Sequence, residues 1–147
     1  MPNSGPSAKL DFSGKGRESA AMIQTLTFVA LGGAIGAALR FLAGLGVIRV
    51  VGPTDFPLAI LFVNVVGSFL MGVFVVLAAQ RGLTDWQPFV MTGVLGGFTT
   101  FSAFSLETMT LIERGDMGHA VLYVLASVLL SVLGLALGLW LMRGLWA

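Results

Sequence analysis

Residues 92–110 read TGVLGGFTTFSAFSLETMT. The stretch is apolar enough to belong to a membrane-spanning helix, yet it holds two adjacent glycines, a run of hydroxyls and one glutamate. A helix that only faces lipid needs none of these. Gly96 and Gly97 weaken helical propensity, and a break at mid-membrane depth frees carbonyls that must be buried in protein or line a cavity. The sequence therefore predicts a membrane helix that is broken near its middle.

The chain around this stretch has the composition of a membrane protein. Of its 147 residues, 56% are hydrophobic and 10% are charged, whereas about 25% charged is usual in soluble domains. A span needs about 20 apolar residues, so there is room for four, and hydropathy places them near residues 23–48, 57–80, 88–112 and 117–142. We expect an all-α integral membrane protein with one four-helix domain over residues 22–147.

The first 21 residues differ from this domain. They carry two prolines, three glycines, four serines and five charges, with almost no large apolar residue. Such a composition cannot bury a core, so we expect residues 1–21 to form a disordered tail.

Several classes of protein are excluded by composition. The chain has no cysteine and one histidine, which removes disulfides, thiolate metal sites and histidine clusters. A formal net charge of +1 with scattered basic residues gives no nucleic-acid footprint. No nucleophile has a histidine and an acid as partners, and no phosphate loop is visible. The chain is therefore not expected to be an enzyme, and transport is the remaining class.

The basic residues in loops and flanks are nearly balanced across the membrane. Without the tail, Arg81 and Arg143 lie on one side, and Arg40, Arg49 and Arg114 on the other. So weak a bias does not fix orientation under the positive-inside rule. An antiparallel, dual-topology homodimer follows as a hypothesis.

Glycines recur at small-xxx-small spacing, in the pairs Gly32 and Gly36, Gly93 and Gly97, and Gly134 and Gly138. This spacing lets helix backbones approach closely, and packing alone explains the first and last pairs best. At the expected break, the carbonyls of Gly96 and Thr99 have two readings. A glycine kink packed against a neighbour is the commoner one, and a site for a small hard cation is the other.

The hydroxyls and aromatic rings also have two readings. Phe98, Phe101 and Phe104 form one stripe with hydroxyls beside it; the stripe is either ordinary packing or a track on which ring edges, which are positive, face an anion. Asn64, in the middle of the second span, must bond across helices or face a wet cavity. On the last span, hydroxyls spaced by four share one face: Tyr123, Ser127 and Ser131.

Two charged residues lie within spans. Arg40 stays charged at ordinary pH, so it must snorkel to the interface or line a vestibule. Glu107, near one end of the third span, pairs with an arginine of a partner, lines a pore mouth or reaches the interface.

Three segments together carry a resemblance. GGAIGAALR at 32–40, FVNVVGSFLMG at 62–72 and TGVLGGFTTFSAFSLE at 92–107 appear in the order and spacing of the Fluc/CrcB family of small fluoride channels. The chain resembles that family over about residues 22–145, and the third segment is the most specific.

The resemblance implies a passive, fluoride-selective channel in the bacterial inner membrane, which exports fluoride from the cytoplasm through two pores of an antiparallel homodimer. It also implies a structural sodium ion at the dimer centre, held by main-chain carbonyls of Gly96 and Thr99 from both subunits. The positions that match the fluoride pathway of the family are Asn64, Phe101, Phe104, Thr100, Ser102, Ser131, Arg40 and Glu107.

One departure from the family is visible on the last span. The family often carries a further hydroxyl one turn after the position of Ser131, where this chain has Leu135. The far end of the track therefore lacks a hydroxyl on this helix, and whether Tyr123 and Ser127 compensate in another register is open.

Two other functions remain as alternatives. A small proton-coupled cation or drug exporter needs a membrane-embedded carboxylate, and Glu107 is the only candidate in the four spans. A membrane subunit without transport activity would use Asn64 and Arg40 only to hold helices together.

Overall fold

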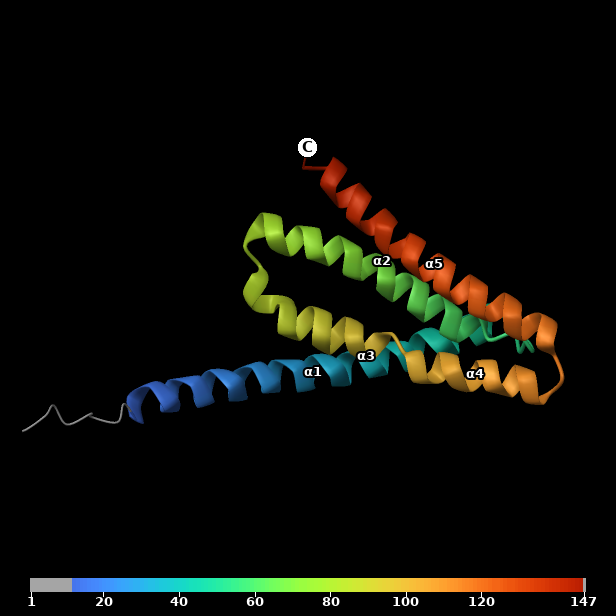
Figure 1. The fold of residues 1–147 in the computed structure, drawn as a ribbon, viewed down its shortest axis with the longest axis horizontal. Helices are drawn as coiled ribbons and strands as arrows, with labels where there is room; N and C mark the ends of the chain where they lie inside the picture. The colour runs from blue at the N-terminus through green and yellow to red at the C-terminus, as the bar shows by residue number, and fades with distance from the viewer. Residues whose placement is uncertain (1–11, 147) are drawn as a thin grey trace, which may run out of the picture.

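The structure, a computed structural model, describes residues 12–146, and all regular structure within them is helical (Figure 1). The elements are α1 (Phe12–Val51), α2 (Leu58–Arg81), a 3-10 turn η1 (Thr84–Trp86), a π-helix η2 (Pro88–Leu95), α3 (Gly96–Phe98), α4 (Phe101–Glu113) and α5 (Met117–Gly144). Four helical units are long and apolar enough to cross a membrane: Gly16–Val51, Leu58–Arg81, Thr84–Glu113 and Met117–Gly144. The expected number of apolar helices, four, is confirmed.

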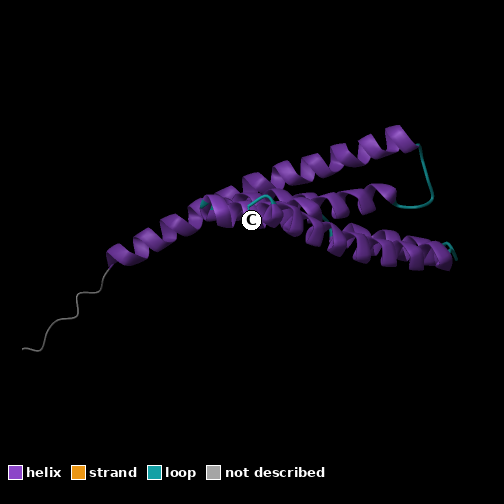
Figure 2. Ribbon diagram, turned by 90° about the horizontal axis from the view of Figure 1, so that it is seen from above, coloured by secondary structure: helices purple, strands orange, loops and turns teal. Residues whose placement is uncertain are grey.

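The helices form two closely packed pairs. α2 packs along α5, and α1 packs along η2 and α3. Figure 1 labels these helices, and Figure 2 shows the same ribbon turned by 90°. Glycines make both approaches close: a Cβ on Gly72 would overlap the Leu135 carbonyl, and one on Gly36 would overlap the Val94 carbonyl. Main chains therefore touch without intervening side chains, which is how helices pack in a membrane. The packing role expected for the glycine pairs is confirmed at Gly36.

Short turns connect the spans. α2 ends at Gly82, whose left-handed conformation (φ 65°) lets its N–H donate to the Ala78 carbonyl. Asp116 begins α5, where its carboxylate accepts a hydrogen bond from the His119 N–H (3.3 Å) and pairs with His119 Nδ1 (2.6 Å). The hydrogen bond from the His119 side chain lowers the pKa of the Asp116 carboxyl.

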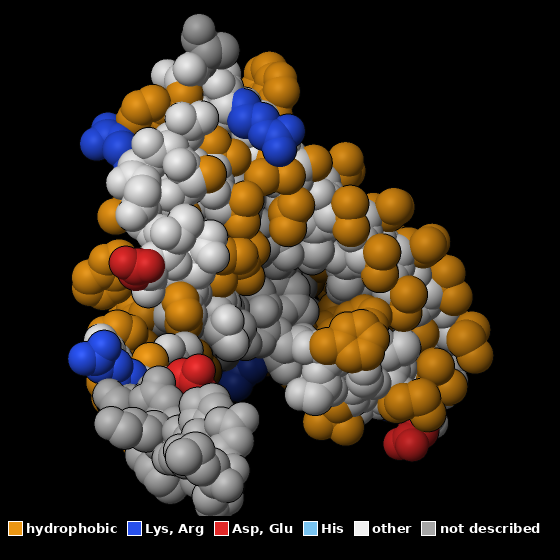
Figure 3. Space-filling model, turned by 60° about the vertical axis from the view of Figure 1, so that its left-hand side comes forward, with side chains coloured by type: hydrophobic (Ala, Val, Ile, Leu, Met, Phe, Trp, Pro, Cys, Tyr) orange, Lys and Arg blue, Asp and Glu red, His pale blue; other side chains and the backbone are white. Residues whose placement is uncertain are grey.

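The core within one chain is small. Val63 and Tyr123 are the largest fully buried side chains, and Figure 3 shows hydrophobic side chains over much of the visible face. Only 6% of the apolar 18-residue stretch of α1 is buried within the chain. A surface so apolar requires lipid or another protein around it.

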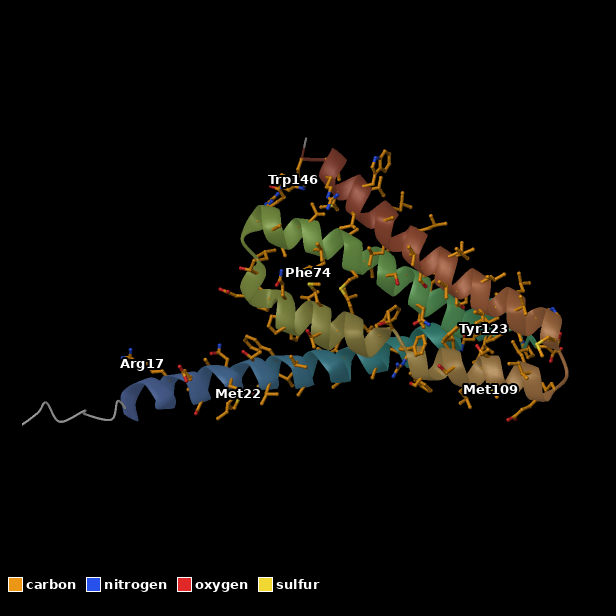
Figure 4. All side chains as sticks on the ribbon, in the orientation of Figure 1. Arg17, Met22, Phe74, Met109, Tyr123 and Trp146 are labelled. Carbon is orange, nitrogen blue, oxygen red and sulfur yellow. The ribbon has the colours of Figure 1, made fainter. Side chains whose placement is uncertain are left out.

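The N-terminal half of α1 extends beyond the rest of the molecule, and Arg17 and Met22 lie on it (Figure 4). Residues 1–11 of the expected tail lie outside the described residues. Residues 12–21 are helical, in continuity with the first span, because adding a residue to an existing helix is far easier than nucleating one. The boundary between tail and domain stays a prediction.

The third membrane-spanning unit is made of η2, α3 and α4, and it bends between the last two. Thr99 (φ −80°, ψ 156°) and Thr100 (φ −153°, ψ 118°) have extended backbone, with helix on both sides. Most of the residues expected at the site lie around this bend.

Candidate functional site

Asn64 of α2 holds the backbone at the bend. The Thr100 N–H donates to Asn64 Oδ1 (2.8 Å), and Asn64 Nδ2 donates to the Thr100 carbonyl (3.1 Å). The side-chain amide thus replaces the helical partners that the extended residue has lost. Because Nδ2 carries two protons, one donor of Asn64 is left over for another ligand.

The side chain of Thr100 is also part of this arrangement. Its hydroxyl accepts a hydrogen bond from the Ala103 N–H (3.2 Å), which caps α4. The same hydroxyl lies 3.2 Å from Ser102 Oγ. Thr100 therefore restarts the helix and brings a second hydroxyl to the bend.

A groove of about 360 Å³ opens beside the bend, between α2, α4 and α5. It brings together five of the predicted pathway residues: Asn64, Thr100, Phe101, Phe104 and Ser131. It also contains residues that the pathway prediction did not include, among them Ser68, Met71 and Ser127. Three helices thus contribute amide, hydroxyl and aromatic groups to one concave surface in a span.

Aromatic rings form a connected series that begins in this groove with Phe101 and Phe104. The ring centroids of Phe101 and Phe104 are 5.3 Å apart, and those of Phe104 and Tyr123 are 5.4 Å apart. Tyr123 lies between α5 and α4 (Figure 4) and is fully buried, with Phe56 packed edge-on against it at 5.7 Å. Phe101 is 78% exposed, so one face of the series is open to whatever surrounds the chain.

Two buried hydroxyls beside the rings have no hydrogen-bond partner among the described residues: Tyr123 Oη and Ser127 Oγ. A buried polar group without a partner costs about 1–3 kcal/mol, so such groups in a native structure indicate a missing ligand or water. Of the hydroxyl face expected on α5, Ser127 and Ser131 line the groove and Tyr123 does not.

Arg40 and Ser102 lie on the other side of the bend. They line a second groove of about 640 Å³, which shares only Thr100 with the first. Arg40 Nη1 donates to the Thr99 carbonyl at 3.4 Å. Glu107 lines neither of these two grooves. The structure therefore brings five predicted residues together, places Arg40 and Ser102 nearby, and leaves Glu107 apart.

The oxygens expected to hold sodium have the chemistry for a hard cation. In a continuous α-helix the Gly96 carbonyl would accept from the Thr100 N–H, which donates to Asn64 instead. The Thr99 carbonyl accepts only the long bond from Arg40, which leaves it a lone pair. Both are oxygen ligands, as a hard cation prefers. Within residues 12–146, no group of three histidine, aspartate or glutamate side chains offers another site.

Comparisons with known sequences find one family and relatives that share one name. Residues 27–139 match the model of the family described as "CrcB-like protein, Camphor Resistance (CrcB)". A fluoride-specific ion channel FluC of Roseobacter denitrificans is 64% identical over 125 residues, which are 84% of this chain and 99% of the relative. Proteins of the same name from Ruegeria sp. and Agrobacterium fabrum are 63% and 48% identical, over 84% and 82% of this chain and 98% and 97% of the relatives.

Proposed function

The chain belongs to the family of CrcB-like proteins, and from that premise we propose that fluoride crosses the membrane along the groove beside the bend. Relatives 64% and 63% identical are named fluoride-specific ion channels, so the chain is a fluoride channel and not an enzyme. With four apolar spans, it is a multi-pass protein of a bacterial membrane. Flux through the channel is passive and follows the electrochemical gradient. Fluoride therefore leaves the cytoplasm whenever it has accumulated there.

The observation that carries this proposal is the set of unsatisfied donors in the groove. The spare Nδ2 proton of Asn64 and the hydroxyls of Ser127 and Ser131 can each replace a water of the anion. Each is neutral, so none holds the ion with the strength of an arginine. Conduction needs sites that bind well enough for entry and weakly enough for exit.

Phe101 and Phe104 contribute through their ring edges, which carry partial positive charge. They are tilted by 46° with respect to each other, so the two rings do not stack face to face. Beside a groove of hydroxyls, such edges attract an anion without offering a strong hydrogen bond. Arg40 and Ser102, in the second groove, would serve as a vestibule that draws anions toward the bend, and Glu107 stays assigned to the far end of the path.

We further propose that sodium binds the main-chain carbonyls of Gly96 and Thr99. Such an ion supplies a fixed positive charge that satisfies freed carbonyls inside the membrane. One chain offers two oxygens, which is too few for a hard cation, so a second copy would supply the others. The residues of this chain would hold the bend in place.

The second copy would be antiparallel, giving two pores per dimer. The near-balanced arginines allow both orientations, and Phe101 offers an open aromatic face. An almost wholly apolar groove lies between the end of α1 and the start of α2, and its lining includes Val47, Leu61 and Phe62. The second copy could cover this groove.

A proton-coupled cation exporter is not favoured. It would need Glu107 as the cation-binding carboxylate of a groove within the spans, and this side chain lines neither of the two grooves. The names of the relatives also point to fluoride rather than to a cation.

The test is ion efflux from liposomes that contain the purified protein. A fluoride electrode records efflux from fluoride-loaded vesicles, and chloride-loaded vesicles run in parallel. Fast fluoride efflux with little chloride leak supports the proposal. No fluoride efflux from a folded, monodisperse protein would overturn it, as would equal chloride efflux.

A further inference from the structure

The hydroxyl face of α5 stops before the groove does. Tyr123, Ser127 and Ser131 follow one another at intervals of four, and the next residue in the series is Leu135. Leu135 still lines the groove. An ion that moves past Ser131 along α5 therefore meets an apolar side chain in place of a donor.

Ser68 of α2 lines the same groove at this level. Two glycine contacts between α2 and α5 fix the register: a Cβ on Gly134 would lie 3.2 Å from the Val65 carbonyl, and one on Gly72 would overlap the Leu135 carbonyl. Ser68 falls between Val65 and Gly72 in the chain. Its side chain thus enters the groove opposite the point where α5 runs out of hydroxyls.

The hydroxyl of Ser68, like those of Ser127 and Ser131 across the groove, makes no hydrogen bond to its own helix among the described residues. Helical serines and threonines commonly donate to the carbonyl four residues earlier, and Ser105, Thr108 and Thr110 do so at 2.8–2.9 Å. Among the side-chain hydrogen bonds of the described residues, none involves Ser68 Oγ. A half-buried hydroxyl that makes no local bond and faces a groove retains its proton for a ligand.

We propose that Ser68 is a fluoride-binding residue, whose hydroxyl donates to the anion at the level of Leu135. The inference rests on the proposed function, since it assumes that the groove is the fluoride path. Ser68 lies one turn after Asn64 on α2, so the two side chains form a second polar wall that faces the hydroxyls of α5. The ion would pass from the α5 wall at Ser131 to the α2 wall at Ser68.

The experiment compares two substitutions of nearly equal volume, Ser68→Thr and Ser68→Val. Only the first keeps a hydroxyl, so added bulk affects both and loss of the donor affects one. Thr110→Val is the matched control, because the Thr110 hydroxyl is bonded to the Leu106 carbonyl. Each variant is purified, checked for the elution volume of the wild type and assayed for fluoride efflux from liposomes over a range of fluoride concentrations.

We expect Ser68→Val to lose about tenfold or more of the fluoride flux, as removal of a hydrogen bond to an ion predicts. Ser68→Thr should keep most of the flux, and Thr110→Val all of it. Equal flux in Ser68→Val and Ser68→Thr would overturn the inference while leaving the channel function intact. If Ser68→Val does not elute as wild type does, Ser68→Ala takes its place, with the same expected loss. No flux from the wild type would instead overturn the proposed function.

Discussion

At the scale of single residues, the side chain of Asn64 both binds the Thr100 backbone and lines the groove. Its carbonyl oxygen and one amide proton bind both polar groups of the Thr100 backbone, and the other proton stays available for the groove. The bend and the proposed ion site are thus stabilised by the same residue. A substitution at Asn64 should therefore affect both, and the effects should be separable by measurement.

We predict that Asn64→Ser abolishes fluoride efflux. Serine is too short to bridge both groups of Thr100, so two part-buried hydrogen bonds are lost, each worth about 0.5–1.5 kcal/mol. The assembly should survive, because the helix contacts at the glycines are untouched. Liposome efflux measures the first effect and size-exclusion chromatography the second. Normal efflux in a folded Asn64→Ser variant would remove Asn64 from the path.

Phe101 provides a test of the ring edges. Because the side chain is 78% exposed, Phe101→Ile should cost one chain little stability, yet it removes the positive ring edge that we propose faces the anion. We expect fluoride efflux to fall to background. Trp140→Ile is the matched control, since Trp140 is 70% exposed and does not line the groove. If both variants conduct alike, Phe101 has no role beyond packing.

At the scale of elements, the close approach of α1 to η2 and α3 positions the bend. A Cβ on Gly32 would overlap the Phe89 carbonyl, whereas nothing lies within 4 Å of one on Gly33. Two adjacent glycines of one helix thus have opposite environments. This contrast allows the packing to be tested without changing the groove.

We predict that Gly32→Ala lowers the stability of the protein by about 1–3 kcal/mol, as overpacking does, and that Gly33→Ala leaves it unchanged or slightly higher, because alanine favours helix. Thermal unfolding in detergent, followed by circular dichroism, compares the two. Equal melting temperatures would mean that α1 does not approach η2 as closely as described.

Sequence patterns predicted the elements better than the contacts between them. Length and hydropathy located four spans because a bilayer fixes both. The break in the third span was expected at Gly96 and Gly97, whereas these residues are helical and the unit bends at Thr99 and Thr100. The Asn64 to Thr100 pairing was beyond reach, since it joins residues 36 apart and no local pattern encodes it. Ser68 was missed because a lone serine in an apolar helix usually bonds to its own backbone. No pattern in residues 88–95 predicts that η2 is π-helical.

Site residues divided in the same way. Phe101 and Phe104 were expected to share one face, as their spacing of three requires, and the structure brings them into one groove. Arg40 belongs to a different groove, because its side of α1 faces the other flank of α4. Spacing within a helix predicts a shared face, but which faces meet depends on how the helices cross.

At the scale of the whole molecule, one chain leaves a large apolar surface uncovered, and the proposed sodium site has only two carbonyl ligands from one chain. The proposed antiparallel dimer covers part of that surface and completes the carbonyl set. It also makes a prediction about orientation that the chain is well suited to test, because it contains no cysteine.

We predict that a single cysteine at Asp85→Cys, in the exposed turn η1, is labelled to about half by a membrane-impermeant thiol reagent applied to intact cells, since balanced charges insert the chain both ways. Permeabilised cells should give complete labelling. Labelling of nearly all or nearly none of the protein in intact cells would contradict dual topology.

The central claim is that fluoride passes through the groove beside Thr99 and Thr100, and blocking this groove tests it most directly. Met71 lines the groove, so a bulky polar thiol reagent attached at Met71→Cys should fill it. We predict that fluoride efflux from liposomes falls to background after modification, while modified Asp85→Cys conducts as before. Unchanged efflux after complete modification of Met71→Cys, verified by mass spectrometry, would contradict the account.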